Sequence, residues 1–529
     1  MEPKLISSLD AYHRLKLDAD RLNRQEFHLK YLLEQENRFE RFSMRRGDLW
    51  FDFSKQRLDQ KTVDHLLELA KARETVEQFR AMADGQKVNT TEQRSAMHMD
   101  ARNGSHPEMN QVNQRIRSFV QDVGDIFSDV VVVGIGGSYL GTEFVYQALQ
   151  SSCKVIRPLH FLSNVDMDDF AAVIKKINPQ KTLWVVVSKS YTTMETLANL
   201  AQVTAFLKAN HLEPRNHIVT ITAKGSPGDQ SEAKSSGEDN GDILASFHMF
   251  DFIGGRYSVT SAVGVLPLSL CFGYPVIERF LKGCGDMDQH AGNAEPKSNM
   301  PLTAALISIW NSHFLEYPAQ AIIPYSSALS RLSPHIQQLY MESLGKQASI
   351  YDSRVEYPTG VIIFGEPGTN AQHSFFQLAH QGAPFPIDFI GVLSPGSTKI
   401  WSTYQGVTNH QELWANLLAQ TQALALGKTD DNIHKVFEGN RPSSTIVIKD
   451  LGPESVGALL AFYEARTVFE GFILGINPFD QFGVELGKTM AKALRGQMAL
   501  KNGSPDHQFD VNDPATRFYL NELFKAGRD

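Results

Sequence analysis

One stretch of the sequence combines a strand of the buried type with a turn rich in hydroxyl groups. Leu183 to Val187 are uninterrupted apolar residues, as in a parallel strand that is covered on both faces. The turn that follows offers hydroxyl donors and one mobile positive charge, from Ser188, Lys189, Ser190, Thr192 and Thr193. Hydroxyl and ammonium groups are suitable donors to an anion such as phosphate.

A helix is predicted to begin directly after this turn. Thr192 and Glu195 have the spacing of a capping box, in which each side chain bonds to the backbone of the other residue. The first N–H groups and the positive end of the helix dipole would then face the turn. The sequence therefore indicates a phosphate site. An ordinary strand-to-helix loop with a good cap is the alternative, because Ser and Thr are common at helix starts for structural reasons.

A glycine-rich turn follows an earlier apolar strand. Residues 134–141 have the sequence Gly-Ile-Gly-Gly-Ser-Tyr-Leu-Gly, in which Tyr139 occupies the last glycine position of a dinucleotide-binding fingerprint counted from Gly134. This spacing argues against a nicotinamide-dependent dehydrogenase. Gly137 and Ser138 would still let a small anion or sugar approach the backbone, and a simple tight turn is the alternative.

Groups for proton and charge chemistry lie in other segments. Arg256 follows two glycines, and its permanent charge could stabilise a developing oxyanion. Glu342 is predicted to lie at the end of a helix, and Glu366 and His373 follow a strand, so each is a candidate acid or base. Three more polar residues lie within about two helical turns of one another, and the last two can pair at i, i+3: Gln481, Glu485 and Lys488.

Alternating strands and helices must position these residues. Apolar strands separated by helices are typical of parallel sheets covered on both faces. A first set of strands is predicted at Asp129–Val133, Leu159–Leu162, Thr182–Val187 and His217–Thr222. A second set is predicted at Ala319–Pro324, Gly360–Phe364, Ile387–Val392 and Thr445–Ile448. Residues 10–110 are predicted to be helical, and residues 223–241 form a polar loop.

Bulk composition narrows the class of protein. The 529 residues are 42% hydrophobic and 21% charged, enough for several buried cores. A net charge of -8 argues against nucleic-acid binding, which needs a broad basic face. Three cysteines, none with a Cys or His at metal-ligand spacing, indicate a reducing compartment. Together with a charged N-terminus that lacks the apolar core of a signal peptide, they predict a cytoplasmic protein. The apolar window Ser261–Ile277 is interrupted by glycine and proline, so it is predicted to be core and not a membrane span.

Taken together, six separated motifs resemble the phosphoglucose isomerase family. The two longest are residues 251–264, beginning Asp-Phe-Ile-Gly-Gly-Arg-Tyr-Ser, and residues 471–488, which include Asp-Gln-Phe-Gly-Val-Glu-Leu-Gly-Lys. Gly-Ile-Gly-Gly-Ser, Ser-Lys-Ser-Tyr-Thr-Thr, Gly-Glu-Pro-Gly-Thr-Asn-Ala-Gln-His and Phe-Glu-Gly-Asn-Arg-Pro stand in the family's order. The resemblance extends from about residue 85 to residue 490.

The resemblance implies a homodimeric enzyme that interconverts glucose 6-phosphate and fructose 6-phosphate without cofactor or metal. It implies two sugar-isomerase α/β sandwich domains with parallel or mostly parallel sheets, at residues 111–268 and 269–490. A helical N-terminal segment, 1–110, would pack on the larger domain, and residues 491–529 would form a C-terminal arm. A non-catalytic sugar-phosphate-binding module is the alternative on the same fold.

The family's motifs also assign roles to particular residues. Glu342 would be the base that moves a proton between C2 and C1 through a cis-enediol, with Arg256 stabilising the enediolate. His373 of the partner subunit would assist ring opening, with Lys488 near the ring oxygen. The remaining substrate contacts would come from Gly137, Ser138, Ser188, Lys189, Ser190, Thr193, Gln338 and Gln481.

Some positions depart from the family's pattern. Leu344 stands where Asn is usual, and Ala371 where Gly is usual. Ser190 and Tyr191 stand where Thr and Phe are usual, and Ser190 keeps the hydroxyl group. Leu344 follows Glu342 closely, so a hydrogen bond near the predicted base is expected to differ. Glu366 remains the rival base.

Overall fold

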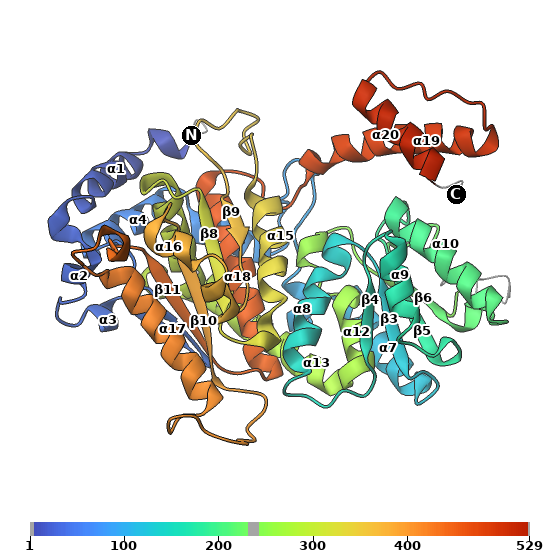
Figure 1. The fold of residues 1–529 in the computed structure, drawn as a ribbon, viewed down its shortest axis with the longest axis horizontal. Coiled ribbons are helices and arrows are strands. Elements are labelled where there is room, and N and C mark those ends of the chain that lie inside the picture. The colour runs from blue at the N-terminus through green and yellow to red at the C-terminus, as the bar shows by residue number, and fades with distance from the viewer. Residues whose placement is uncertain (1–4, 231–242, 527–529) are drawn as a thin grey trace. The chain divides into compact units, whose positions relative to one another are not determined.

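The computed structural model describes residues 5–230 and 243–526 of the chain (Figure 1). These residues form two compact units, Met1–Phe479 and Asp480–Asp529, and each unit is described by itself. The predicted polar loop at 223–241 lies mostly outside the described residues.

The first sheet of the larger unit has five parallel strands in the order β4-β3-β5-β6-β7. The strands are β3 (Asp129–Val133), β4 (Leu159–Leu162), β5 (Thr182–Val187), β6 (Ile218–Thr222) and β7 (Ala245–His248). Every residue of β3 and β5 is buried, which explains the unbroken apolar runs that follow the first residue of each strand. Strand β7 was not predicted; it is only four residues long and follows the polar loop.

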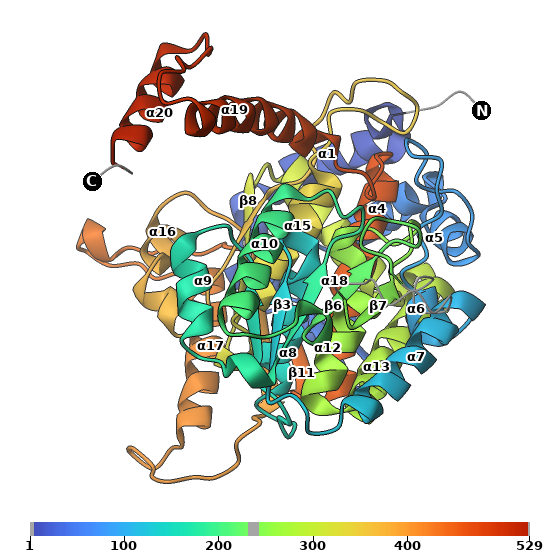
Figure 2. The ribbon, with the colours of Figure 1, turned by 90° about the vertical axis from the view of Figure 1, so that its right-hand side faces the viewer.

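Alternate residues of these strands enter two different cores. Val131 and Trp184 pack with α9 (Met167–Ile174) and α10 (Met194–Ala209). Figure 2 shows these two helices in front of the sheet. Val130 and Val185 point to the other face and belong to the main core. That core also takes residues from three helices, α7 (Pro107–Val123), α8 (Leu140–Leu149) and α12 (Ala262–Phe272).

The second sheet has six strands in the order β1-β2-β11-β10-β8-β9. Four of them are parallel and confirm predicted strands: β8 (Ala319–Pro324), β9 (Ile362–Phe364), β10 (Ile387–Ser394) and β11 (Ser443–Asp450). The other two, β1 (Ser43–Arg46) and β2 (Leu49–Asp52), form a hairpin that adds antiparallel to β11. The mostly parallel α/β architecture is therefore confirmed.

The prediction of an entirely helical N-terminal segment is wrong at this hairpin. Leu49 and Phe51 are buried because β2 pairs with β11, almost 400 residues later in the chain. Both strands are only four residues long and β1 contains two exposed arginines, so neither gives a clear periodic pattern. The rest of the segment is largely helical, with α1 (Asp10–Leu22), α2 (Leu29–Leu32), α3 (Arg38–Arg41), α4 (Gln60–Ala72), α5 (Thr75–Ala83) and α6 (Asp100–Asn103).

A long central helix, α18 (Pro453–Leu474), is buried along almost its whole length. It packs against α13 (Tyr274–Asn293), α14 (Met300–Ile309) and α15 (Leu332–Leu344), and Figure 1 shows α15 and α18 between the two sheets. The guanidinium of Arg466 on α18 forms a buried ion pair with Asp388 on β10, at 2.7 Å. Two further helices flank the second sheet, α16 (Phe376–Gln381) and α17 (Asn409–Leu426).

The predicted core segment at Ser261–Ile277 is confirmed over α12, every residue of which is buried, whereas Pro275 beyond this helix is exposed. Pro267 lies inside this helix without ending it. Among the helices that the structure describes, none is long and apolar enough to cross a membrane. The smaller, C-terminal unit contains α19 (Glu485–Gly503) and α20 (Pro514–Ala526), and the ring of Phe509 packs on Phe524 of α20.

Two glycines allow α13 and α18 to approach closely. A Cβ atom on Gly283 would lie 2.1 Å from the backbone oxygen of Glu454, and one on Gly457 would lie 2.2 Å from that of Phe280. Gly285 is on the same helix as Gly283, but a Cβ atom there would meet nothing within 4 Å. A side chain at position 283 would therefore clash with α18, whereas a side chain at position 285 would have open space.

We expect Gly283→Ala to lower the free energy of unfolding by about 1–3 kcal/mol, because the added methyl group forces the helices apart. Gly285→Ala is the matched control, and we expect it to raise that free energy by up to about 1 kcal/mol through helix propensity. Denaturant unfolding followed by circular dichroism measures both. Equal effects of the two substitutions would contradict the close packing.

Candidate active site

Two short turns meet through their backbones at the end of the first sheet. The turn η3 (Gly136–Ser138) follows β3, and η6 (Gly255–Tyr257) lies beyond β7. A Cβ atom on Gly137 would lie 2.3 Å from the carbonyl carbon of Gly255, so only glycine fits there. The hydroxyl of Ser258 also donates to the carbonyl of Gly137, at 3.2 Å. The glycine-rich turn therefore holds the segment that carries Arg256.

Arg256 and Glu342 come together beside these turns. The Nη1 atom of Arg256 lies 3.6 Å from Oε1 of Glu342, which projects from the last turn of α15. The amide of Gln338, one helical turn earlier, donates to Oε2 of Glu342 at 2.9 Å. The Arg256 side chain is 1% exposed and that of Glu342 is 23% exposed. The cluster thus places a carboxylate that solvent reaches beside a buried positive charge.

Two further residues, Ser343 and Tyr257, contact the Arg256 side chain or each other and were not predicted. The Nε atom of Arg256 donates to Oγ of Ser343 at 2.6 Å, and Nη2 donates to the carbonyl of Pro478 at 2.7 Å. The hydroxyl of Tyr257 lies 2.9 Å from the same Ser343 oxygen. Ser343 and Tyr257 are next to Glu342 and Arg256 in the sequence, and that adjacency was the only signal available.

The turn after β5 leads into α10, but the predicted capping box is wrong. Helix α10 begins at Met194, and its N-cap is Thr193, whose side chain makes no capping hydrogen bond. Instead, the hydroxyl of Ser188 donates to that of Thr193 at 3.3 Å, and the hydroxyls of Ser190 and Thr192 lie 2.5 Å apart. The first N–H groups of α10 therefore have no side-chain acceptor at the N-cap.

Lys189 connects this turn to the segment that carries Arg256. Its Nζ atom donates to the carbonyls of Asp251 and Ile253, at 2.9 and 3.3 Å. It also lies 3.5 Å from the Asp251 carboxylate. Burial lowers the pKa of Lys189 because it disfavours the charged ammonium, and the charge of Asp251 opposes this effect.

His373 lies elsewhere in the larger unit. It ends the short helix η10 (Asn370–His373), which follows β9, and it is exposed. Glu366 lies on the same stretch and is half-buried. Within the described residues, Glu366 has no ion pair or hydrogen bond, whereas Glu342 has both a guanidinium and an amide neighbour.

Gln481 and Lys488 belong to the C-terminal unit. Gln481 precedes the short helix η12 (Phe482–Val484), and Lys488 lies on α19. Lys488 pairs with Glu485 at 2.9 Å, as the i, i+3 spacing predicts. The structure thus brings together Gly137, Arg256, Gln338 and Glu342, with the Lys189 turn attached through Asp251.

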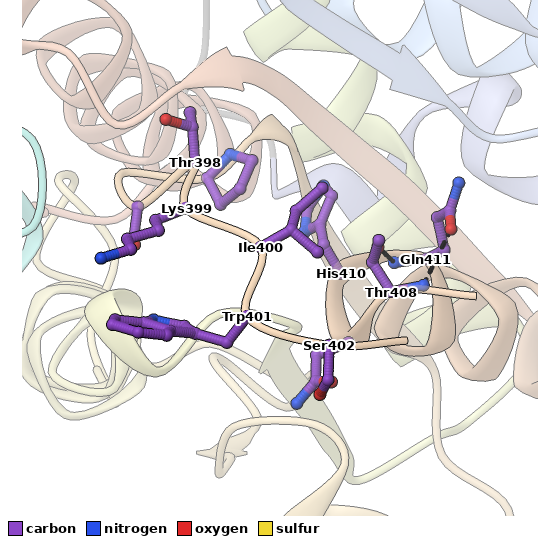
Figure 3. A pocket seen from close by; sticks show the side chains of 11 residues that line it. Thr398, Lys399, Ile400, Trp401, Ser402, Thr408, His410 and Gln411 are labelled. Atoms are coloured by element: carbon purple, nitrogen blue, oxygen red, sulfur yellow. Dashed lines mark hydrogen bonds between the residues drawn. The ribbon is translucent and has the colours of Figure 1, made fainter. Parts of the chain in front are cut away.

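A different pocket, of about 590 Å³, lies beside the loop that precedes α17 (Figure 3). Its wall includes Trp401, with Nζ of Lys399 3.6 Å from the ring centre, and His410, whose ring bonds to the carbonyl of Leu393. None of its lining residues is an aspartate or a glutamate. This pocket therefore lacks the carboxylate and guanidinium found at Glu342 and Arg256. In the described part of the chain, no cluster of His, Cys, Asp and Glu could hold a metal ion.

Comparison with known proteins gives a consistent result. The family model described as phosphoglucose isomerase matches residues 52–514. The chain is 54% identical to a glucose-6-phosphate isomerase of Desulfosudis oleivorans, covering 100% of both chains. It is 41% identical to a cytosolic glucose-6-phosphate isomerase of Arabidopsis lyrata, covering 93% of each.

A crystal structure of a glucose-6-phosphate isomerase from Chlamydia trachomatis has the same fold. Its TM-score against this chain is 0.89 at 34% identity, covering 99% of this chain and 100% of that one. The matched residues 52–514 include both glycine-rich turns, the Lys189 turn and α15. The chain therefore belongs to the phosphoglucose isomerase family.

Proposed function

We propose that this chain interconverts glucose 6-phosphate and fructose 6-phosphate. The observation that supports this most strongly is the pairing of Glu342 with buried Arg256 at 3.6 Å, in a chain that belongs to the phosphoglucose isomerase family. Moving a proton next to a carbonyl needs a carboxylate base and a positive group where the oxyanion forms.

Glu342 takes the proton from one of the two reacting carbons and returns it to the other, through a cis-enediol. Its exposed fraction of 23% leaves it accessible to a sugar, while the amide of Gln338 holds one carboxylate oxygen. Arg256 stabilises the negative charge that develops on the enediolate. Because its guanidinium is almost fully buried, this charge acts where water screens it little.

The phosphate group binds at the start of α10. Ser188, Lys189, Ser190 and Thr193 supply hydroxyl and ammonium donors, and the N-terminal N–H groups lack a side-chain cap. Such a helix end attracts anions through its dipole and its unpaired donors. The sugar lies against the glycine-rich turn, at Gly137 and Ser138, and is contacted by Gln338.

Three roles rest on the family resemblance. His373 of the partner subunit assists ring opening in a homodimer, and the exposure of this residue in one chain is compatible with that role. Lys488 acts near the ring oxygen, and Gln481 contacts the substrate. No cofactor or metal takes part.

We propose that the chain has two main domains, each built around one of the two sheets. Residues 111–268 form a smaller sugar-isomerase domain and 269–490 a larger one, with the N-terminal segment 1–110 on the larger domain and 491–529 as an arm. A cytoplasmic location is proposed, which accords with relatives that are named cytosolic isomerases.

The direct test measures turnover of fructose 6-phosphate by the purified protein in a coupled assay without added cofactor for the isomerase. Glucose 6-phosphate is the expected product. A folded protein that binds the sugar phosphate without turnover would instead support a non-catalytic binding module.

Glu342→Gln should reduce kcat by about a hundredfold to ten-thousandfold, because it removes the base. Exchange of the substrate C2 proton with deuterated water, followed by NMR, should disappear as well. Binding of 6-phosphogluconate, measured by calorimetry, should change little. Glu366→Gln is the matched control and should keep near-normal turnover; the reverse pattern would make Glu366 the base.

Lys189→Met should raise KM about tenfold to a hundredfold with a smaller change in kcat, because a charged phosphate contact is lost. In the unsubstituted protein, the lowered pKa of Lys189 means that its charge is lost at a lower pH than that of an exposed lysine. KM should therefore rise at alkaline pH, and Lys189→Met should abolish that rise.

Lys181→Met is the control for this experiment. Lys181 is exposed and precedes β5, at the opposite end of the strand from Lys189. Lys181→Met should give the same KM as the unsubstituted protein at every pH. If both substitutions raised KM equally, the phosphate would not bind at the start of α10.

A further inference from the structure

A ring of hydrogen bonds links the guanidinium of Arg256 to Ser343, Tyr257 and Pro478. Its Nε atom lies 2.6 Å from Oγ of Ser343, which lies 2.9 Å from the hydroxyl of Tyr257. That hydroxyl lies 3.4 Å from the carbonyl of Pro478, which also accepts from Nη2 of Arg256 at 2.7 Å. Arg256, Ser343 and Tyr257 are at most 2% exposed, so water does not compete for these groups.

The chemistry of the groups gives these hydrogen bonds a direction. A guanidinium can only donate and a carbonyl can only accept. Among these four groups, one arrangement gives every hydroxyl hydrogen an acceptor: Arg256 donates to Ser343, Ser343 to Tyr257, and Tyr257 to Pro478. Burial raises the pKa of Tyr257, because it disfavours the charged phenolate, so this hydroxyl keeps its proton.

This arrangement determines the orientation of the guanidinium plane. Ser343 accepts a hydrogen bond from Nε, and the carbonyl of Pro478 accepts one from Nη2. Because the guanidinium is rigid and planar, these two bonds direct its third nitrogen, Nη1, toward Glu342. Ser343 is adjacent to Glu342 on α15, so the same helix presents both the carboxylate and the oxygen that orients the guanidinium.

We propose that Ser343 is a positioning residue for the isomerisation, whose hydroxyl orients Arg256 relative to Glu342 and to the enediolate. This inference rests on the proposed function, because it assigns Ser343 a part in the same reaction. Tyr257 supports the orientation by accepting from Ser343 and donating to Pro478. Neither residue contacts the substrate, and both act through Arg256.

Ser343→Ala should lower kcat about tenfold to a hundredfold, the loss expected for one hydrogen bond to a charged group. KM for fructose 6-phosphate should change less than about threefold, since the phosphate contacts remain. The control is Ser333→Ala, which removes another buried hydroxyl of α15, one that donates to the carbonyl of Ile322 at 2.7 Å. It should leave kcat within about twofold of the original value.

A double-mutant cycle separates positioning from a general structural role. If Ser343 acts through Arg256, Ser343→Ala should change kcat less than about twofold in an Arg256→Ala background. A purely structural role would give the same loss in both backgrounds and would overturn the inference. Full activity of Ser343→Ala alone would overturn it too.

Tyr257→Phe provides a second route if Ser343→Ala does not fold. It removes only the hydroxyl, and the ring keeps its stacking on His98, with ring centres 4.7 Å apart. We expect a loss of kcat of about threefold to tenfold that disappears in the Arg256→Ala background. An undiminished loss there would count against positioning. Absence of turnover in the unsubstituted protein would refute the proposed function itself. The outcomes above, in an active unsubstituted protein, would refute only the positioning role of Ser343, so the two failures are distinguishable.

Discussion

Burial of the Arg256 guanidinium is the constraint on which the site depends. A positive charge that is 1% exposed has lost its hydration, and this costs several kcal/mol unless charge and hydrogen bonds replace it. Ser343, the Pro478 carbonyl and the Glu342 carboxylate supply the replacement. The same loss of water makes the charge effective, because opposite charges attract more strongly where the dielectric constant is low.

Several elements must meet to supply those partners. Arg256 comes from a turn after the first sheet, Glu342 and Ser343 from α15, and Pro478 from the segment after α18. Close backbone contact between Gly137 and Gly255 places the turn. A buried hydrogen bond from Tyr340 of α15 to Glu470 of α18, at 2.5 Å, fixes the helix that carries Glu342. Burial raises the pKa of Glu470 to about 7.

Much of the fold and part of the site follow from local sequence. The parallel strands are rich in apolar residues because both faces of each sheet are covered, and eight of them were predicted near their observed bounds. The hairpin β1–β2 was missed, because both strands are only four residues long and β1 contains two exposed arginines. The capping box was wrong because Thr193 takes the cap position and its hydroxyl is occupied by Ser188.

The sequence by itself determined the mostly parallel α/β architecture, the family and the residue types that could transfer a proton or bind phosphate, because these depend on local runs and motif spacing. Tertiary structure decided which of those residues meet. Arg256 lies 86 positions before Glu342, yet the two side chains are 3.6 Å apart. The role of Ser343 also depends on the tertiary structure, since its hydroxyl acquires its partners only when α15 packs against the Arg256 turn. Packing of that kind leaves no mark on a local sequence pattern.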